Sequence, residues 1–579
     1  MRTTTEQPAG EPVPRPVLEI KGLSVDFRDR SGAWVETTHG VDVSLAAGET
    51  VALVGESGSG KSVTAMSVLG LLPDTARRRG QIMFDGVDLV TAPEAVVRRI
   101  RGDRIAMVFQ EPMTALNPVW TIGNQLGRAV RAHRRVSRAS VRARVLELLR
   151  LVRMPAPESR VDSYPHQLSG GQRQRAMIAM AIACDPEVLI ADEPTTALDV
   201  TVQAEILDLL DDLKRKLSLA LLVITHDMGV VAETADRVVV MRRGAVVEEA
   251  LCERLFADPR DDYTRELLAA VPHLGEAIVP AARPGRLTGT KHGAPAPESA
   301  AGTTLRVEGL TVEYRARRRA AFRAVEGIDL RVGGGEVVGL VGESGSGKST
   351  IGRAVVGLTR ATQGRIEVAG SEVTTARGKA LRAIRRDIGF VFQDPASSLD
   401  PRRSIGDSVV SPLRAHGAAG GGAELRTRAR ALLDQVRIPG DWADRFPHEL
   451  SGGQRQRVGI ARALALGPRL IIADEPTSAL DVSVQAAVVR LLLDLQQEHG
   501  FACLFISHDL AVVEQLAHRV VVLRSGRIVE QGPARDVLRD PREEYTRRLV
   551  MSAPVPDPVA QRHRRDLRRG TPVAEPEAP

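Results

Sequence analysis

The sequence is poor in cysteine, in aromatic residues and in long apolar runs. Only three cysteines occur in 579 residues, Cys184, Cys252 and Cys503. None has a CxxC partner or the spacing of a zinc site, so we predict packing residues in a reducing compartment. Aromatic residues make up 3% of the chain, which argues against stacking surfaces for single-stranded nucleic acid.

No stretch is apolar over the roughly 18 to 20 residues that a membrane-spanning helix requires. The most apolar run, Leu219 to Ile224, has the length of a strand. The first residues, MRTTTEQPAGEPVPRP, lack the apolar core of a secretory signal. We therefore expect a cytoplasmic protein that reaches a membrane only by docking to a partner.

The positive charge is modest and dispersed. The formal net charge is +7, and only residues 561–569 form a basic cluster, which we interpret as part of a solvated tail. With few aromatic residues as well, the sequence predicts no nucleic-acid partner. A chain of this length is too long for a single hydrophobic core, and two or more domains are expected.

Four motifs occur twice in the same order. GESGSGKS lies at 55–62 and, 287 residues later, at 342–349; LSGGQRQR, ADEPT and HD each recur 282 residues apart, from 168, 191 and 226. This spacing indicates a tandem duplication. The predicted organisation is a disordered N-terminus (1–16), a first domain (17–272), a flexible Pro/Gly/Ala-rich linker (273–303), a second domain (304–552) and a disordered C-terminal tail (553–579).

Short apolar runs bounded by turn residues recur between helical patterns, at 50–55, 187–192, 337–342 and 469–474. Runs of this kind are typical of buried strands in a parallel sheet covered by helices. Residues 111–167 and 394–449 have apolar residues at three- and four-residue spacing and are predicted to be helical inserts. Each copy is therefore predicted to be an α/β domain with a helical subdomain.

GESGSGKS predicts a phosphate-binding loop between a strand and a helix. Glycines let the loop turn its N–H groups inward, the lysine places a positive charge at the β- and γ-phosphates, and the serine hydroxyl ligates magnesium. The predicted nucleotide-binding residues are Gly55, Glu56, Ser57, Gly58, Ser59, Gly60, Lys61, Ser62 and Val63 in the first copy, and Gly342, Glu343, Ser344, Gly345, Ser346, Gly347, Lys348, Ser349 and Thr350 in the second.

Acidic pairs follow apolar strands in both copies. Asp192 and Asp474 end their strands, where an ionised carboxylate needs a cation, and we assign them to magnesium. Glu193 and Glu475 come next and are predicted to polarise or deprotonate the attacking water. The histidines of the HD motifs, His226 and His508, also follow apolar strands, and we predict contacts with the γ-phosphate.

Together with these motifs, LSGGQ and the glutamines Gln110 and Gln393 resemble the ABC ATPase family over nearly the whole chain outside the linker and tails. The resemblance implies two P-loop ABC-type domains that bind ATP and Mg²⁺, with both glutamines among the residues of the metal site. It also implies that the LSGGQ segment of each copy, called the signature, contacts ATP held by the lysine of the other copy. One aromatic residue in each copy is implied to stack on adenine. The residues concerned are Ser169, Gly170 and Gly171 (with Lys348), Ser451, Gly452 and Gly453 (with Lys61), and the aromatic residues Phe27 and Tyr314.

The sequence around the motifs resembles a smaller group within this family. FQEPMTALNP (109–118), FQDPASSLDP (392–401), and the domain ends DPRDDYTRELL and DPREEYTRRLV are similar to ATPases of oligopeptide, dipeptide and nickel importers. This resemblance implies an ATPase on the cytoplasmic side of the cell membrane that works with two integral membrane permeases and, indirectly, an extracytoplasmic solute-binding protein. Several relatives hold an iron–sulfur cluster through cysteines after the YTR segment; this chain has none there, and we predict no cluster.

Other functions remain open at this point. A soluble tandem ABC ATPase acting on ribosomes or DNA is the main alternative, although such proteins usually carry a long charged arm, zinc modules or coiled coils. A fused sugar-importer ATPase usually has one degenerate site, whereas both glutamates are present here. An exporter is disfavoured because no membrane domain is attached. The solutes proposed are di- and oligopeptides, or a nickel chelate or glutathione-like compound.

Overall fold

The structure is a computed structural model of the whole chain that describes residues 16–29, 31–196, 198–272, 274, 302–314, 322–394, 398–418, 421–478 and 480–570. The chain divides into two compact units. The first comprises residues 1–198, 202–269 and 554–579, and the second comprises residues 199–201 and 270–553. The predicted disordered N-terminus and flexible linker lie almost entirely outside the described residues.

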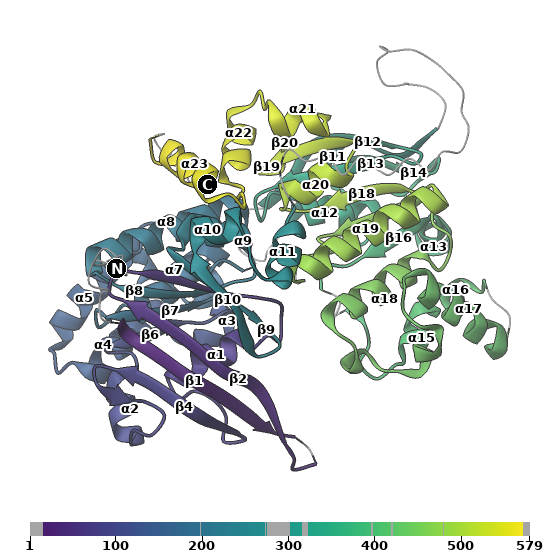
Figure 1. The fold of residues 1–579 in the computed structure, drawn as a ribbon. Helices are drawn as coiled ribbons and strands as arrows, with labels where there is room; N and C mark the ends of the chain where they lie inside the picture. Colours follow the sequence, from purple (N-terminus) through teal and green to yellow (C-terminus); the bar gives the residue numbers. More distant parts are fainter. Residues whose placement is uncertain are drawn as a thin grey trace, which may run out of the picture. The chain divides into compact units, whose positions relative to one another are not determined.

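The first unit contains two sheets (Figure 1). An antiparallel sheet has the order β2-β1-β4-β5, and a six-stranded sheet has the order β10-β9-β3-β8-β7-β6, in which only β10 is antiparallel to its neighbour. The strands are β1 (Pro16–Arg28), β2 (Trp34–Ala46), β3 (Thr50–Val54), β4 (Ala76–Phe84), β5 (Val87–Asp88), β6 (Ile105–Val108), β7 (Val188–Asp192), β8 (Ala220–Ile224), β9 (Arg237–Arg242) and β10 (Ala245–Leu251).

Helices connect these strands and form a helical subdomain between β6 and β7. The helices are α1 (Lys61–Val68), α2 (Glu94–Ile100), α3 (Pro112–Ala115), α4 (Ile122–His133), α5 (Arg138–Leu151), α6 (Pro157–Arg160), the 3₁₀ turn η1 (Pro165–Gln167), α7 (Gly170–Ala181), α8 (Val200–Leu217), α9 (Met228–Thr234), α10 (Cys252–Ala257), α11 (Asp262–Ala269) and, from the end of the chain, α23 (Pro558–Gly570).

The second unit repeats this plan, with sheets in the orders β12-β11-β14-β15 and β16-β17-β18-β13-β19-β20. Its strands are β11 (Thr303–Tyr314), β12 (Phe322–Gly333), β13 (Val337–Gly342), β14 (Gln363–Val368), β15 (Ser371–Glu372), β16 (Ile388–Val391), β17 (Leu470–Asp474), β18 (Ala502–Ile506), β19 (Arg519–Arg524) and β20 (Arg527–Pro533). Its helices are α12 (Lys348–Val355), α13 (Gly378–Ile384), η2 (Arg385–Asp387), α15 (Ile405–Val409), α16 (Ser411–His416), α17 (Gly422–Gln435), η3 (Gly440–Asp444), η4 (Pro447–Glu449), α18 (Gly452–Leu464), α19 (Val482–His499), α20 (Leu510–Leu516), α21 (Ala534–Arg539) and α22 (Glu544–Ser552).

In each unit one core joins the two sheets through the helix that follows the phosphate-binding loop. In the first unit, Ala65, Val68 and Leu69 of this region pack with buried residues of β1, β3 and β7. Helix α12 occupies the same place in the second unit. A separate core in each unit joins the helical subdomain to the other face of the six-stranded sheet. The α/β architecture and the helical inserts are therefore as predicted, and the four short apolar runs form β3, β7, β13 and β17.

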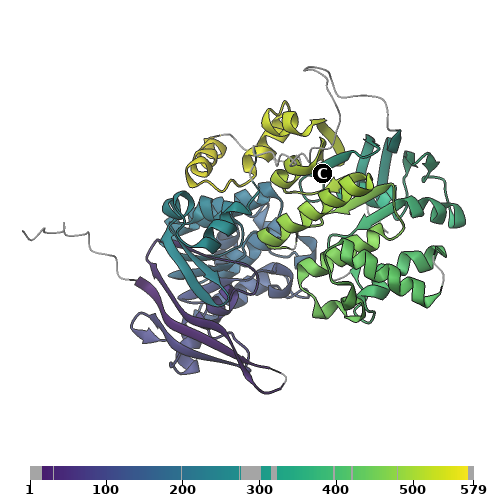
Figure 2. The same ribbon diagram turned by 45° about the vertical axis from the view of Figure 1, so that its right-hand side comes forward.

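The C-terminal prediction is wrong for part of its length. Residues 558–570, predicted to be disordered and solvated, form α23, which belongs to the first unit (Figures 1 and 2). Gln561 is fully buried, and several arginines of the basic cluster form ion pairs. The prediction failed because the partners of this helix are acidic side chains more than 300 residues earlier in the chain. Residues 571–579 lie outside the described residues.

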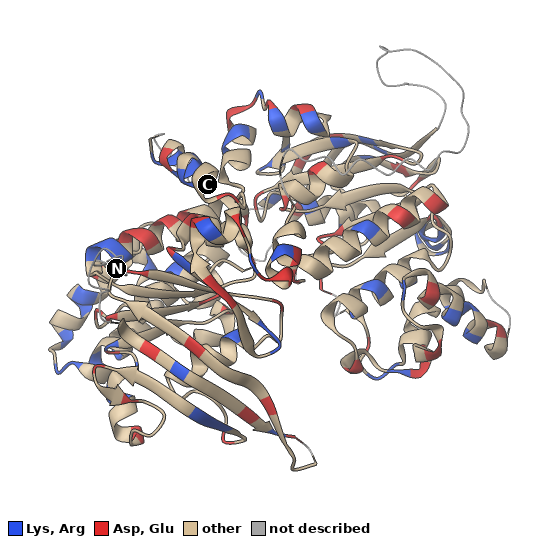
Figure 3. Ribbon diagram, viewed as in Figure 1, with Lys and Arg blue, Asp and Glu red and all other residues tan. Residues whose placement is uncertain are grey.

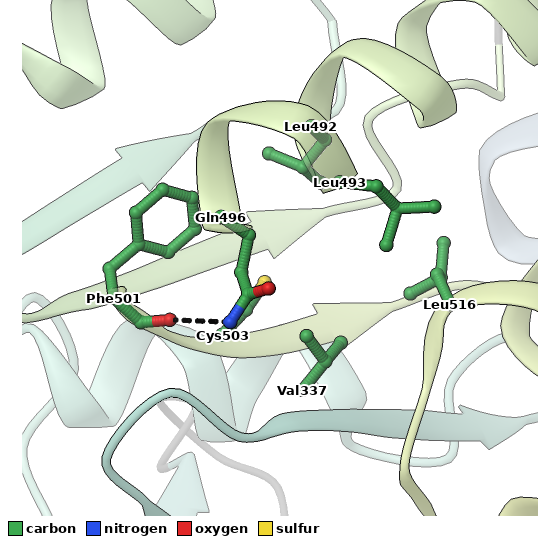
Figure 4. A pocket seen from close by; sticks show the side chains of 7 residues that line it. All are labelled: Val337, Leu492, Leu493, Gln496, Phe501, Cys503 and Leu516. Carbon is green, nitrogen blue, oxygen red and sulfur yellow. Dashed lines mark hydrogen bonds between the residues drawn. The ribbon is translucent and has the colours of Figure 1, made fainter. Parts of the chain in front are cut away.

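The three cysteines are buried, as expected for packing residues. Cys503 lines a small cavity of the second unit with apolar side chains of α19, α20 and β13, while Gln496 at its edge donates a hydrogen bond to the Phe501 carbonyl (3.3 Å; Figure 4). Burial raises the pKa of the Cys503 thiol to about 12. Among the described residues, no helix has both the length and the apolar character needed to span a bilayer.

Candidate functional site

Each phosphate-binding loop has a backbone that only glycine can adopt at its first position. Gly55 has φ +146°, and a Cβ there would lie 2.1 Å from the Met241 carbonyl oxygen. Gly342 in the second unit has φ +147°, with the corresponding distance to the Leu523 oxygen 2.2 Å. These contacts fix the loop against β9 or β19, and the chain enters α1 or α12 through a left-handed glycine, Gly60 or Gly347.

The loop lysines point into the loop that carries them. The Lys61 ammonium donates to the carbonyl oxygens of Gly55 (2.7 Å) and Glu56 (2.8 Å), and only 6% of the residue is exposed. Lys348 makes the equivalent bonds, at 2.7 and 2.9 Å, and its burial lowers its pKa. A buried ammonium at the first residue of a helix that follows a glycine-rich loop suits a multiply charged anion such as a phosphate chain.

Two tyrosines support these loops and were not singled out from the sequence. The Glu56 N–H donates to the Tyr263 hydroxyl (3.1 Å), and the Glu343 N–H donates to the Tyr545 hydroxyl (3.3 Å). Both tyrosines come from the YTR segments at the domain ends, on α11 and α22. The signal that could have identified them was the repeat of these segments, which marked a family resemblance but not a contact with the loop.

A serine hydroxyl and a buried aspartate face each other in each unit. The Ser62 hydroxyl donates to Asp192 at 3.2 Å, and Ser349 donates to Asp474 at 2.8 Å. Burial raises the pKa of Asp192 to about 6, and burial also raises the pKa of Asp474, although both accept a serine hydrogen bond. Hydroxyl and carboxylate oxygens are magnesium ligands, and a divalent cation would stabilise the buried carboxylate, so these residues fit Mg²⁺.

The glutamate after each aspartate has a strained backbone. Glu193 has φ +46° and Glu475 φ +45°, in the left-handed region that non-glycine residues seldom occupy. A backbone hydrogen bond holds each one, from Glu193 N–H to Ile224 O (2.8 Å) and from Glu475 N–H to Ile506 O (2.9 Å). Strain of this kind costs on the order of 1–3 kcal/mol and persists where surrounding structure imposes it, commonly at functional sites.

Three side chains converge on the Glu193 carboxylate. His226 Nδ1 lies 3.0 Å from one oxygen, while the Gln110 amide (2.6 Å) and the Thr196 hydroxyl (2.9 Å) donate to the other. Burial alone would raise the pKa of this carboxyl, but hydrogen bonding and charge at His226, with the Thr196 bond, hold it at about 2. Glu193 is therefore ionised at neutral pH and can act as a base or orient a water molecule.

The second unit repeats this cluster. Gln393 donates to Glu475 at 2.8 Å, and His508 Nδ1 lies 3.4 Å from the same carboxylate. Burial opposes ionisation of both partners, yet their mutual hydrogen bond leaves the Glu475 pKa lowered and the His508 pKa raised. The two glutamines thus contact the glutamates in this structure, and their predicted place near the metal stays a prediction.

The signature segments begin helices α7 and α18. Ser169 caps α7 by accepting from the Gln172 N–H (3.3 Å) while its own N–H donates back to the Gln172 side chain, and Ser451 forms the same capping box. A Cβ on Gly171 would lie 2.5 Å from Val202 of α8, so this glycine allows close helix packing. The Gln174 side chain then ties α7 to the Pro194 carbonyl (2.6 Å), next to Glu193.

The two predicted adenine-stacking residues end strands of the antiparallel sheets. Phe27 is half-buried near the end of β1 and packs on the core between the two sheets of the first unit. Tyr314 is the last residue of β11 and is 44% exposed. Neither residue lies on the strand that leads into a phosphate-binding loop, and stacking on adenine stays a prediction for both.

Family comparisons agree with this geometry. The family described as "ABC transporter" matches residues 38–196 and 325–478, which contain the phosphate-binding loop, signature and acidic pair of each unit. The family described as "Oligopeptide/dipeptide transporter, C-terminal region" matches residues 529–578. The second match covers α21, α22 and α23, including the helix that sequence reasoning had assigned to a disordered tail.

Known relatives are similar over nearly the full chain. The glutathione import ATP-binding protein GsiA of Salmonella choleraesuis is 47% identical over 575 residues, covering 96% of this chain and 92% of the relative. GsiA of Pectobacterium atrosepticum is 47% identical over 564 residues, covering 94% and 90%. A solved ATP-binding cassette, MJ0796 bound to ADP and phosphate, is 33% identical over 40% of this chain and 98% of that chain, with a TM-score of 0.37. The chain is an ATPase with two ATP-binding cassettes, and it belongs to the ABC transporter family.

Proposed function

We propose that this chain is the ATP-hydrolysing subunit of an ABC importer for small peptides, with glutathione-like tripeptides as its solute class. The observation that carries this proposal is the contact between a glutamine and a glutamate in both units, in a chain 47% identical over 96% of its length to a glutathione import ATP-binding protein. The match to the C-terminal region of oligopeptide and dipeptide transporters supports the same solute class.

The proposed site roles follow from the contacts. The loop residues and lysines bind the phosphates of ATP, and Mg²⁺ is held by Ser62 and Asp192 in one unit and by Ser349 and Asp474 in the other. With its own base, each unit activates a water molecule for attack on the γ-phosphate. The HD histidines, the loop glutamines and the signature serines are assigned to the γ-phosphate and its surroundings, and no iron–sulfur cluster is proposed.

Membrane permeases are the proposed partners, at the cytoplasmic face of the membrane. The segment around Gln110 exposes apolar side chains at the edge of the helical subdomain, namely Phe109 (38% exposed), Met113 (49%) and Val119 (72%). The equivalent segment of the second unit exposes Phe392 (42%). Exposed apolar side chains beside a glutamine that contacts the catalytic glutamate suit a permease helix, because docking there would be felt at the ATPase site.

The test is reconstitution of the chain with its copurifying permeases and binding protein in vesicles. ATP-dependent uptake of labelled glutathione, a dipeptide, an oligopeptide, a nickel chelate and a sugar would be compared, with the Glu193→Gln/Glu475→Gln protein as the matched control. We expect uptake of glutathione or short peptides that the control lacks. Uptake of the sugar alone would refute the solute class, and copurification with ribosomes and no membrane protein would refute the importer.

A further inference from the structure

The last helix of the chain belongs to the first unit, although the ATPase domain that precedes it in sequence is the second unit. Helix α23 groups with the first unit, and Figures 1 and 2 both show it beside α8 to α10. It carries five arginines within thirteen residues, and Asp557 caps its start by accepting from the N–H groups of Val559 (2.9 Å) and Ala560 (3.0 Å). Figure 3 shows its positive segments next to negative segments of α8.

A buried glutamate lies at the centre of the contact. The side chain of Glu233, on the last turn of α9, is only 2% exposed. Its carboxylate accepts a hydrogen bond from Gln561 (2.6 Å), which is itself fully buried, and forms an ion pair with Arg568. An ionised carboxylate removed from water needs such partners, so this contact is built into the fold.

Further ion pairs extend the contact onto α8. Arg569 lies 3.1 Å from Asp208 and 3.0 Å from Asp211, which are on neighbouring turns of that helix. At the other end of α23, Arg562 pairs with Glu253 of α10. Helix α23 therefore joins three helices of the first unit through charged side chains.

The internal repeat shows that only the first unit has this acidic surface. The acidic pairs and the HD motifs of the two units are both 282 residues apart, so the same spacing relates the helices around them. At the positions equivalent to Asp208, Asp211 and Glu233, the second unit has Arg490, Leu493 and Gln515. Among the carboxylates that pair with α23, the second unit keeps an acidic residue only at the position of Asp212, as Asp494, so most of this negative surface has no counterpart there.

Helices α8 and α9, which α23 contacts, are connected to the first ATPase site. Helix α9 begins after His226, and Asp227 caps it by accepting from the Gly229 N–H (2.8 Å) and, through its other oxygen, from Gln203 of α8 (3.2 Å). The segment before α23 packs on the first turn of α9, because a Cβ on Gly229 would lie 2.5 Å from the Pro554 side chain. The C-terminal segment therefore contacts both ends of α9.

We propose that α23 and its acidic surface form an intramolecular latch that positions His226 and makes the first ATPase site unequal to the second. The proposal rests on the proposed role of His226 at the γ-phosphate. The latch holds α8 and α9 together, and the histidine at the start of α9 is thereby held against Glu193. The second unit lacks the acidic surface, so its His508 has no such restraint from α23.

The test uses charge reversal in the full chain. Glu233→Arg should increase hydrogen–deuterium exchange of residues 228–234 and leave residues 510–516 unchanged. It should also lower kcat for ATP roughly 2- to 30-fold at nearly constant KM, since couplings carried through packed helices are about 0.5–2 kcal/mol and the phosphate-binding loop is not touched. The double variant Glu233→Arg/Arg568→Glu should restore both measurements, and Gln515→Arg, at the equivalent position of the second unit, should change neither.

Each other outcome counts against the latch. Unchanged exchange of α9 in Glu233→Arg would show that α23 is not docked, and altered exchange with unaltered kcat would remove the positioning role. A double variant as impaired as the single one would refute the ion pair. If Glu233→Arg does not fold, Gln561→Ala provides the same comparison with a milder change. His226→Ala tests the underlying site separately, because an unchanged kcat there would refute the histidine assignment whatever the exchange data show.

Discussion

Replacing Glu193 and Glu475, the two proposed bases, by glutamine should slow turnover strongly while the protein still folds and binds ATP. Glu193 and Glu475 are partly buried carboxylates in strained left-handed conformations, each bonded to a histidine and a glutamine. A positioned general base contributes about 10²- to 10⁴-fold to a rate. Loss of both bases should therefore raise the barrier by about 3–5.5 kcal/mol.

The local hydrogen bonds indicate that this loss would not come from misfolding. One oxygen of Glu193 accepts from both Gln110 and Thr196, and the other faces His226 Nδ1. A glutamine can keep its carbonyl oxygen toward the two donors and turn its NH₂ toward the histidine, which accepts at Nδ1 in its neutral tautomer. Every polar group then keeps a partner, so the free energy of unfolding should change by less than about 1.5 kcal/mol.

The assay is phosphate release under saturating Mg²⁺–ATP, with binding of a fluorescent ATP analogue and the melting temperature measured on the same samples. The two single variants, Glu193→Gln and Glu475→Gln, compare the units directly. Turnover by the double variant within about threefold of the unmodified protein, a barrier change below 1 kcal/mol, would refute the assignment. A large loss of ATP binding or of melting temperature would instead refute the hydrogen-bond argument.

Three further predictions address the loops and the thiols. Tyr263→Phe and Tyr545→Phe each remove the acceptor of a loop N–H. Each substitution should lower the free energy of unfolding by about 0.5–1.5 kcal/mol and weaken ATP binding several-fold, as measured by calorimetry. Unchanged affinity in both variants would show that the loops do not need this support. Gly55→Ala places a methyl group 2.1 Å from the Met241 carbonyl oxygen and should abolish binding at the first loop, and a variant that binds ATP normally would contradict the loop geometry. The buried thiols should resist a disulfide reagent at pH 8 until the protein is denatured, because burial raises the pKa of Cys503 to about 12 and also raises the pKa of Cys184 and Cys252; labelling of the folded protein at the rate of the denatured protein would argue against this.

The strands, the phosphate-binding loops and the acidic pairs could be predicted because their signals are local. A strand such as β7 is four apolar or small residues followed by Asp192, and the loop glycines have the conformations that their positions require. The duplication doubled each signal and made the α/β assignment secure. The strained backbone of Glu193 could not be read from the sequence, because it arises from a hydrogen bond to Ile224 on another strand.

The supporting tyrosines and α23 could not be predicted for a related reason. Tyr263 looks like a core residue of an amphipathic helix, and its contact with the loop at Glu56 spans 207 residues of sequence. Helix α23 has few apolar residues, and its sequence alone does not show which surface its charged side chains contact. Its ion-pair partners include Asp208, Asp211 and Glu233, which lie far from it in the sequence and could be recognised only once the helix is seen beside them.

Because the chain ends in the first unit, the second ATPase unit is, in topological terms, an insertion in the first. The first unit is built from residues before Ala270 and after Ala553, so the second unit has a covalent connection to it at both of its ends. A gene split within residues 275–301 would leave two polypeptides, and the second would still carry the helix that belongs to the first. In such a split protein, α23 would still attach the second polypeptide to the first. If residues 554–579 were also removed, this attachment through α23 would be lost. Affinity tags or fluorescent proteins placed at the C-terminus would likewise report on the first unit, and not on the second unit that immediately precedes them in sequence.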